Sequence, residues 1–266
     1  MAETTRRWLP LLPILLWALA ALSADLAGEP AARIHLQQIL DPPGGGSLLG
    51  FDDLGRPILY RLWSGAQISF LVAFGVVTLS LLIGTLVGLV AGYRGGWMDL
   101  LLMRIVDVFL AFPGILLAIA LAGVMGPGID NLIIALSAVG WVGYARLARG
   151  QVLSLKQREH VTAAQALGIP GWRILGRHIL PLLGAPLIVE ATFGLAGTVI
   201  AEAGLSYLGL GVQPPQASWG SMIRDGASYM LMAPHMVLAP GVAIMLVVLS
   251  LNLIGDQLRD WLDHRI

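Results

Sequence analysis

Long apolar runs separated by short polar segments set the pattern of this chain. A helix needs about 20 consecutive apolar residues to cross the hydrocarbon core of a bilayer. One run carries no charged residue between positions 68 and 92, and several others approach that length. We therefore expect an all-α integral membrane protein with about six transmembrane helices, at residues 8–26, 68–93, 106–125 (bent at Pro113), 132–147, 186–210 and 236–254.

The first apolar run admits two interpretations. Arg6 and Arg7 precede it, and Ala20, Ser23 and Ala24 near its end are small, which is typical of a secretory signal peptide. Cleavage there would leave five spans and would place the two ends of the chain on opposite sides of the membrane. We expect a retained transmembrane helix, and a cleaved signal peptide is the alternative.

Composition agrees with a membrane protein. Of the 266 residues, 57% are hydrophobic and 12% are charged, whereas a soluble domain carries about 25% charged residues. The formal net charge is zero, so nothing points to nucleic acid as a partner. The chain has no Cys, which excludes disulfides, thiolate catalysis and Cys-ligated metals. It also lacks a G-x-x-x-x-G-K-[ST] phosphate loop, so any ATP-driven work must be powered by another chain.

The distribution of Lys and Arg predicts the orientation, because cytoplasmic flanks of membrane helices carry an excess of both. With the N-terminus inside, inner segments hold twelve of the sixteen Lys and Arg residues and outer segments hold four. We therefore expect both termini in the cytoplasm. The predicted organisation is an N-terminal helix (1–27), an outer segment (28–66), a five-helix core (67–258) with a cytoplasmic loop (148–185), and a cytoplasmic tail (259–266).

The cytoplasmic loop is far longer than a simple connection requires. Good helix formers fill residues 157–167, and Gly168 is expected to end that helix with a positive φ. A Pro-Gly corner follows, then a second helix over 172–180, with Pro181 at the return to the membrane. Small residues, Ala163 and Ala164, would let another backbone approach closely. The loop is thus predicted to dock a soluble partner, and the alternative is an amphipathic hairpin whose arginines bind anionic lipid headgroups.

The sequence TAAQALG, followed after nine residues by HILP, resembles the EAA–x3–G–x9–I–x–LP loop of ABC-importer permeases. Two positions depart from that pattern, because Thr162 stands where Glu is usual and His178 where Ile is usual. The resemblance implies that this loop couples to cytoplasmic ATPases. The residues expected to carry the coupling are Glu159, Thr162, Ala163, Ala164, Gly168 and Pro181.

The resemblance extends over nearly all of residues 48–263. The segments LLGFDDLGR, GAQISFLV, AGYRGGWMDLLLMRIVDVFLAFP, GWVGYARLARGQVLSLKQREHV, AEAGLSYLGLGVQPPQASWGSMI and NLIGDQLRDWLD are similar to the dipeptide/oligopeptide/nickel class of these permeases, in the second (C-type) permease position. Phe51 and Pro57 depart from the family pattern, at positions where Thr and Asp are usual.

That resemblance implies a type I ABC-importer permease fold in a bacterial inner membrane, with the outer segment in the periplasm. The implied partners are a homologous permease that completes the translocation pathway, two cytoplasmic ATPases and an external solute-binding protein. ATP and Mg would be bound by the ATPases, and no cofactor or catalytic residue is expected in this chain. The implied solutes are dipeptides, oligopeptides, nickel chelates, opines or glutathione.

Two carboxylates, Glu190 and Glu202, lie in or near the fifth apolar run. Buried carboxylates are unfavourable in lipid and are functional candidates for that reason. Each can line the pathway, for example to meet the amino group of a peptide, or can bond a neighbouring helix. Because helix positions advance by about 100° per residue, the two side chains are roughly 120° out of phase and form no paired site. We expect a structural role for Glu190 and leave both roles open for Glu202.

Other charged residues carry weaker predictions. Arg104 and Asp107 are three residues apart on one helix face and can pair, and Asp99 is expected at a helix start. The five histidines show no metal-ligand spacing, so no metal site is expected. A self-sufficient secondary transporter or channel remains an alternative, but it would normally show an internal repeat and midplane charges. An intramembrane enzyme is a second alternative, although no H-E-x-x-H or G-x-S-x-G sequence is present.

Overall fold

The computed structural model describes residues 9–44 and 46–263, which form helices and loops without a β-strand. The predicted start of the first span at residue 8 and residues 264–266 of the predicted tail lie outside this part. The helices are α2 (Leu11–Leu22), α3 (Asp25–Ala32), a 3-10 turn (Leu36–Gln38), α4 (Ile58–Arg94), α5 (Gly96–Leu110), α6 (Gly114–Met125), α7 (Ile129–Leu155), α8 (Glu159–Ala166), α9 (Gly171–Ile174), a π-helical turn (Leu175–Ile179), α10 (Leu180–Tyr207), α11 (Trp219–Ala227) and α12 (His235–Asp263).

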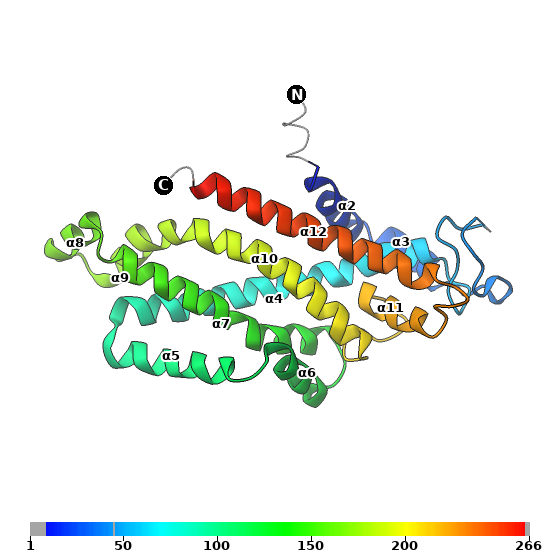
Figure 1. Cartoon of the computed structure of the whole chain (residues 1–266), viewed down its shortest axis with the longest axis horizontal. Helices are drawn as coiled ribbons and strands as arrows, with labels where there is room; N and C mark the ends of the chain where they lie inside the picture. Colours follow the sequence, from blue (N-terminus) through cyan, green and yellow to red (C-terminus); the bar gives the residue numbers. More distant parts are fainter. Residues whose placement is uncertain (1–8, 45, 264–266) are drawn as a thin grey trace, which may run out of the picture.

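The apolar runs form the long helices that their pattern predicts. Four continuous helical stretches are long and apolar enough to cross a membrane, or six if each of two bent helix pairs counts as one span. The long helices α4, α7, α10 and α12 and the shorter α5 lie roughly along one direction, with α8 and α9 projecting at one end and the outer segment at the other (Figure 1). The all-α membrane fold is therefore confirmed. The last helix continues to Asp263, so most of the predicted tail is helical.

The third predicted span, at residues 106–125, is wrong as a single helix. The structure has two helices there, α5 and α6, which meet at an angle of 84°. Pro113 explains the break, because it has no N–H for the helical ladder and disfavours helical backbone at Phe112. The bend predicted at Pro113 is thus confirmed, but it redirects the chain far more than a kink does.

Close packing of α4 against α7 forms the centre of the bundle. Gly84, Gly88 and Gly92 recur every four residues and lie on one face of α4. A Cβ atom at Gly84 would overlap the carbonyl of Trp141, and one at Gly88 would overlap the carbonyl of Ala145. Small residues at this spacing let two membrane helices approach until their backbones touch. We call these three positions the glycine seam.

The outer segment folds onto the ends of α4 and α11 through a buried charge cluster. Asp52 accepts hydrogen bonds from Arg56 Nε at 2.7 Å and from Arg61 Nη1 at 2.6 Å. Its second oxygen accepts the backbone N–H groups of Leu54 and Arg56. Arg61 also lies 3.4 Å from Asp225 of α11. Two cations thus share one fully bonded carboxylate, which ties the outer segment to the bundle.

Helix α2 packs against the bundle through an aromatic cluster. Trp17 is buried and its indole N–H donates to the carbonyl of Ala66 in α4 at 3.2 Å. Its ring contacts Phe70 edge-on at 5.1 Å and lies 5.9 Å from the ring of Trp219. A large apolar side chain buried in this way contributes about 3 kcal/mol or more of stability. The first helix therefore belongs to the packed structure.

Candidate functional site

The turn after α8 has the geometry that the sequence predicts. Gly168 has a φ of +73°. Its N–H donates to the carbonyl of Gln165 at 2.9 Å, and the N–H of Ile169 donates to the carbonyl of Ala164 at 3.1 Å. This pair of bonds is a Schellman ending, which requires a residue that accepts positive φ. The prediction for Gly168 is confirmed, and we call residues 159–181 the inner hairpin.

The two faces of α8 differ. Val161 and Ala164 are buried, in a cluster with Ile174 and with side chains of the membrane helices. Ala163 is exposed on the opposite face, as are Glu159 and Thr162. The close approach expected at both alanines therefore fits Ala163 only, because Ala164 already packs inside the hairpin.

Large apolar side chains are exposed at the tip of the inner hairpin. Leu167 is 81% exposed and Trp172 is 71% exposed. The guanidinium of Arg173 lies 5.2 Å from the centre of the Trp172 ring. Thr162 donates its hydroxyl hydrogen to the carbonyl of Glu159 at 2.9 Å, which occupies that donor within the helix. The tip thus presents an apolar surface with basic groups beside it.

The second hairpin helix differs from its prediction at 172–180. A single turn of α9 is followed by a π-helical turn, which runs directly into α10. The whole stretch from Gly171 to Tyr207 qualifies as one membrane-length helix. Pro181, exposed in the first turn of α10, cannot donate the α-helical bond to the carbonyl of Arg177. The π-helical turn lies directly before this missing bond.

Glu202 is enclosed by hydroxyl groups. It is 1% exposed and accepts hydrogen bonds from Ser69 of α4 at 3.0 Å and from Ser206 at 2.7 Å. These bonds link α10 to α4 and satisfy a carboxylate that has no contact with solvent. The structure therefore supports the structural interpretation of Glu202, and its interpretation as a pathway-lining residue does not fit this enclosed position.

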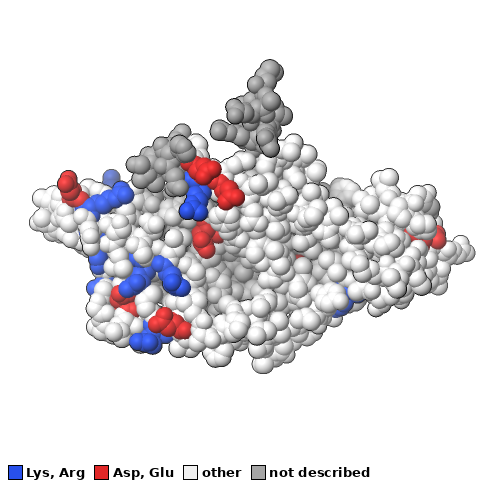
Figure 2. Space-filling model, in the orientation of Figure 1, with Lys and Arg blue, Asp and Glu red and all other residues white. Residues whose placement is uncertain are grey.

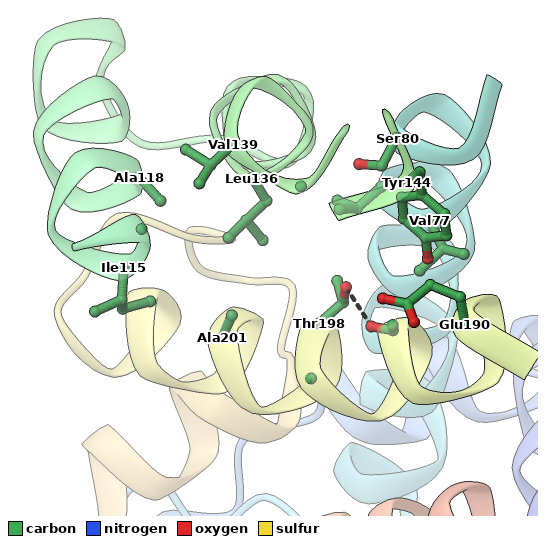
Figure 3. A pocket seen from close by; sticks show the side chains of 15 residues that line it. Val77, Ser80, Ile115, Ala118, Leu136, Val139, Tyr144, Glu190, Thr198 and Ala201 are labelled. Atoms are coloured by element: carbon green, nitrogen blue, oxygen red, sulfur yellow. Dashed lines mark hydrogen bonds between the residues drawn. The ribbon is translucent and has the colours of Figure 1, made fainter. Parts of the chain in front are cut away.

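Glu190 instead borders a cavity of about 340 Å³ between α4, α6, α7 and α10 (Figure 3). Its side chain is half-buried and makes no hydrogen bond or ion pair with the described residues. The bond to a neighbouring helix that we expected for Glu190 is thus missing, and Glu190 rather than Glu202 borders a cavity. The cavity is lined by Val76, Val77, Ser80, Gly114, Ile115, Ala118, Leu136, Val139, Gly140, Tyr144, Glu190, Gly194, Gly197, Thr198 and Ala201.

Two further polar groups of this cavity have no hydrogen-bond partner among the described residues. They are the hydroxyl of Tyr144 on α7 and the hydroxyl of Ser80 on α4, and both atoms are buried. Figure 3 shows the Tyr144 hydroxyl on the side of its ring that faces Glu190. A Cβ atom at Gly194 would overlap that hydroxyl, so glycine is needed there to make room for it. Unpartnered buried hydroxyls are uncommon in folded proteins.

Charged residues gather at the end of the molecule that carries α8 and α9, and most of the remaining visible face is uncharged (Figure 2). The pair predicted between Arg104 and Asp107 is confirmed, with 3.8 Å between the charged atoms and both side chains largely exposed. Asp99 lies in the first turn of α5, where it accepts two hydrogen bonds from Arg149, at 2.6 and 2.8 Å. No local pattern predicts this pair, because its members are fifty positions apart. Within the described residues, no group of three or more His, Asp or Glu side chains can hold a metal.

Residues 84–266 match the family described as "Binding-protein-dependent transport system inner membrane component". The chain belongs to this family. The matched region contains the inner hairpin, α5 to α7 and α10 to α12. Membership establishes a multi-pass subunit of a bacterial inner-membrane transport system, which works together with permease, ATPase and binding-protein subunits. It supports the importer interpretation and not the self-sufficient carrier or channel.

Named relatives are similar over most of this permease. It is 44% identical over 241 residues to the dipeptide transport system permease protein DppC of Alkalihalophilus pseudofirmus, covering 91% of this chain and 79% of the relative. It is 48% identical over 217 residues to the glutathione transport system permease protein GsiD of Shigella sonnei, covering 82% and 72% of the two chains. An inward-facing structure of the MetNI methionine ABC transporter superposes with a TM-score of 0.62 at 19% identity, over 76% of this chain and 96% of that one. This likeness establishes the type I importer permease fold.

Proposed function

We propose that this permease forms half of the translocation pathway of an ATP-driven importer for di- or oligopeptides or a related small solute such as glutathione. A homologous permease supplies the other half, two cytoplasmic ATPases dock on the inner hairpins, and a periplasmic binding protein delivers the solute. ATP and Mg belong to the ATPases, and this chain binds no cofactor. The names of the relatives support the solute class.

The inner hairpin is the observation that carries this proposal. Its buried face, with Val161 and Ala164, holds it to the membrane helices, so it moves together with them. Its outer face leaves Leu167 and Trp172 exposed. Exposed apolar patches mark contacts with other proteins or with the membrane, and an aromatic anchor such as Trp172 is typical of a protein contact. A soluble ATPase is the partner that covers them.

A continuous helix connects the hairpin to the membrane interior. The stretch from Gly171 to Tyr207 runs without interruption from the hairpin, past Glu190, to the opposite end of the bundle. Movement of the docked ATPases is therefore transmitted to the residues that line the cavity. Each ligand shifts the equilibrium between inward-facing and outward-facing states only by its differential affinity for them.

The orientation completes the proposal. Both termini and the inner hairpin face the cytoplasm, in agreement with the excess of Lys and Arg at that end. The first apolar run is retained as a bent span formed by α2 and α3, which meet at 72°, since Trp17 of α2 is buried and bonded to Ala66 of α4. The buried charge cluster around Asp52 then lies at the periplasmic face, where the binding protein arrives.

The test of the docking proposal is a detergent pull-down of the tagged permease, co-expressed with its partner permease and both ATPases. We expect the wild-type chain to retain the ATPases and Leu167→Asp to lose them. Leu36→Asp is the matched control, because Leu36 is also exposed but lies in the outer segment. A wild-type chain that purifies alone and still moves solute in vesicles would overturn the importer proposal.

The test of the orientation uses single cysteines, since the chain has none of its own. A cysteine at Gln165 is expected to resist an impermeant thiol reagent added to spheroplasts and to react after lysis. A cysteine at Leu48, exposed in the outer segment, is expected to react in both preparations. Labelling of the Gln165 position from outside intact spheroplasts contradicts the proposed topology.

A further inference from the structure

The cavity around Glu190 combines features that ordinary helix packing does not require. Glu190 lies ten residues into α10, which places it about 15 Å along the helix from its inner end. A carboxylate at such a depth is strongly unfavourable if it faces hydrocarbon. Glu190 forms no ion pair among the described residues and borders the cavity, so it is available to a positively charged ligand there.

The wall of the cavity supplies a matching set of polar groups. The hydroxyl oxygen of Tyr144 is buried, unpartnered and directed towards Glu190 (Figure 3). The hydroxyl of Ser80, also unpartnered, lies further along the same wall. By contrast, the hydroxyl hydrogen of Thr198 is already donated to the carbonyl of Gly194 at 2.8 Å. The unused groups therefore concentrate on the wall formed by α4 and α7, opposite Glu190.

A protonated amine fits this arrangement better than the other groups of a small solute. An ammonium group donates up to three hydrogen bonds and carries one positive charge, so it can bond the Glu190 carboxylate and the Tyr144 hydroxyl oxygen together. A carboxylate or phosphate would be repelled by Glu190. The remaining lining is apolar or glycine, which accommodates small side chains and leaves the charged contact to fix the orientation of the ligand.

We propose that this cavity is a transient binding site, called the station below, for the protonated amino group of the solute on its way through the permease. Glu190 supplies the counter-charge and Tyr144 the second contact. This inference rests on the proposed function, because it assumes that the cavity faces the translocation pathway. Every peptide with a free amino terminus carries such a group, and so does glutathione. The station would therefore recognise a feature that these solutes share rather than their side chains.

The test uses the complete transporter in proteoliposomes: both permeases, the ATPases and the binding protein. Uptake of radiolabelled Ala-Ala and of glutathione is measured together with ATP hydrolysis. We expect Glu190→Gln to lower the uptake per ATP by about tenfold or more, as for the loss of one charge-assisted hydrogen bond. Glu190→Asp should restore part of it, and Tyr144→Phe should give a smaller loss. Asp130→Asn is the matched control, since it removes a similar charge from an exposed position at the start of α7.

The outcomes separate the station from the proposed function. If the wild-type transporter moves neither peptide, the proposed solute class is wrong and the station falls with it. If the wild-type chain moves a peptide and Glu190→Gln moves it with equal yield per ATP, the solute class stands and the station is refuted. A parallel loss of uptake and of ATP hydrolysis in Glu190→Gln would indicate a structural role and would likewise refute the station.

Discussion

The outer segment and the inner hairpin lie at opposite ends of the same bundle. They differ in whether their most prominent side chains are bonded within this chain or left exposed. In the outer segment, Asp52 is bonded to two buried arginines and to two backbone N–H groups. At the hairpin tip, Leu167 and Trp172 remain uncovered. The buried charges of the outer end find their partners within this chain, whereas the apolar side chains at the hairpin tip are the surface that we propose the ATPase covers. The contrast separates residues that stabilise the permease from residues that connect it.

The largest effect is expected at the turn of the inner hairpin. Gly168→Pro removes the N–H that bonds Gln165 and replaces a φ of +73° with one near −65°. We expect the hairpin to lose its shape and the permease to lose the ATPases completely in a detergent pull-down, while still inserting into the membrane. Gly168→Asn is the control, because Asn tolerates positive φ and should keep most of the retention. Equal retention by wild type and Gly168→Pro would show that the turn does not shape the docking surface.

A large effect on stability, without an effect on docking geometry, is expected at the outer end. Asp52→Asn removes the carboxylate that bonds both buried arginines and leaves only the longer pairs of Arg56 with Asp53 at 3.5 Å and of Arg61 with Asp225 at 3.4 Å. Breaking a buried pair by removing one partner typically costs about 3–5 kcal/mol. Thermal unfolding in detergent should show a clearly lower midpoint. It can be followed by circular dichroism or by a dye that does not react with cysteine, since the chain has none. A midpoint equal to that of the wild-type chain would mean that the cluster does not hold the outer segment to the bundle.

A moderate effect on binding alone is expected for Trp172→Ala. The side chain is exposed in the isolated permease, so its removal should change stability by no more than about 0.5 kcal/mol. If Trp172 anchors the ATPase, the affinity should fall by about 2 kcal/mol, which is roughly thirtyfold. A titration of detergent-solubilised permease with purified ATPase measures this. A loss of thermal stability as large as that of Asp52→Asn would assign Trp172 to the fold instead.

The smallest effect is expected at Asp53, next to the charge cluster. Burial and the neighbouring charge of Asp52 raise the pKa of Asp53 above its usual value of 3.8. Its charged form is thus disfavoured in the folded state. The stability of the wild-type chain relative to Asp53→Asn should decline as the pH rises from 3.8 through the raised pKa, and then stay constant. Near pH 7 the variant should be as stable as the wild type or slightly more so, which unfolding midpoints across that pH range would show.

The predictions that the structure confirms are those that rest on residues close together in the sequence. The apolar runs, the ending of α8 at Gly168 and the pair of Arg104 with Asp107 all depend on neighbours within a few positions. The bend at Pro113 was predicted in place but not in size, since its angle depends on what α5 and α6 pack against.

Contacts between distant segments could not be predicted in the same way. The bond between Asp99 and Arg149 joins α5 to α7. Tyr144 and Glu190 line the same cavity only because α7 and α10 pack together. The roles of Glu190 and Glu202 depend on which helix faces each carboxylate, and their phase along one helix does not reveal this. For the same reason, the sequence did not show that Ala164 packs inward.

The glycine seam also limits how this chain can vary. At Gly84 and Gly88 the atoms that a side chain would strike belong to the backbone of α7, so no choice of rotamer can relieve the overlap. Trimming a facing side chain cannot compensate for such a substitution, because the carbonyl oxygens of Trp141 and Ala145 would still be struck. These two positions are closed to all other amino acids unless α4 and α7 separate along their length, so a change in this pair of helices requires a change in how they pack.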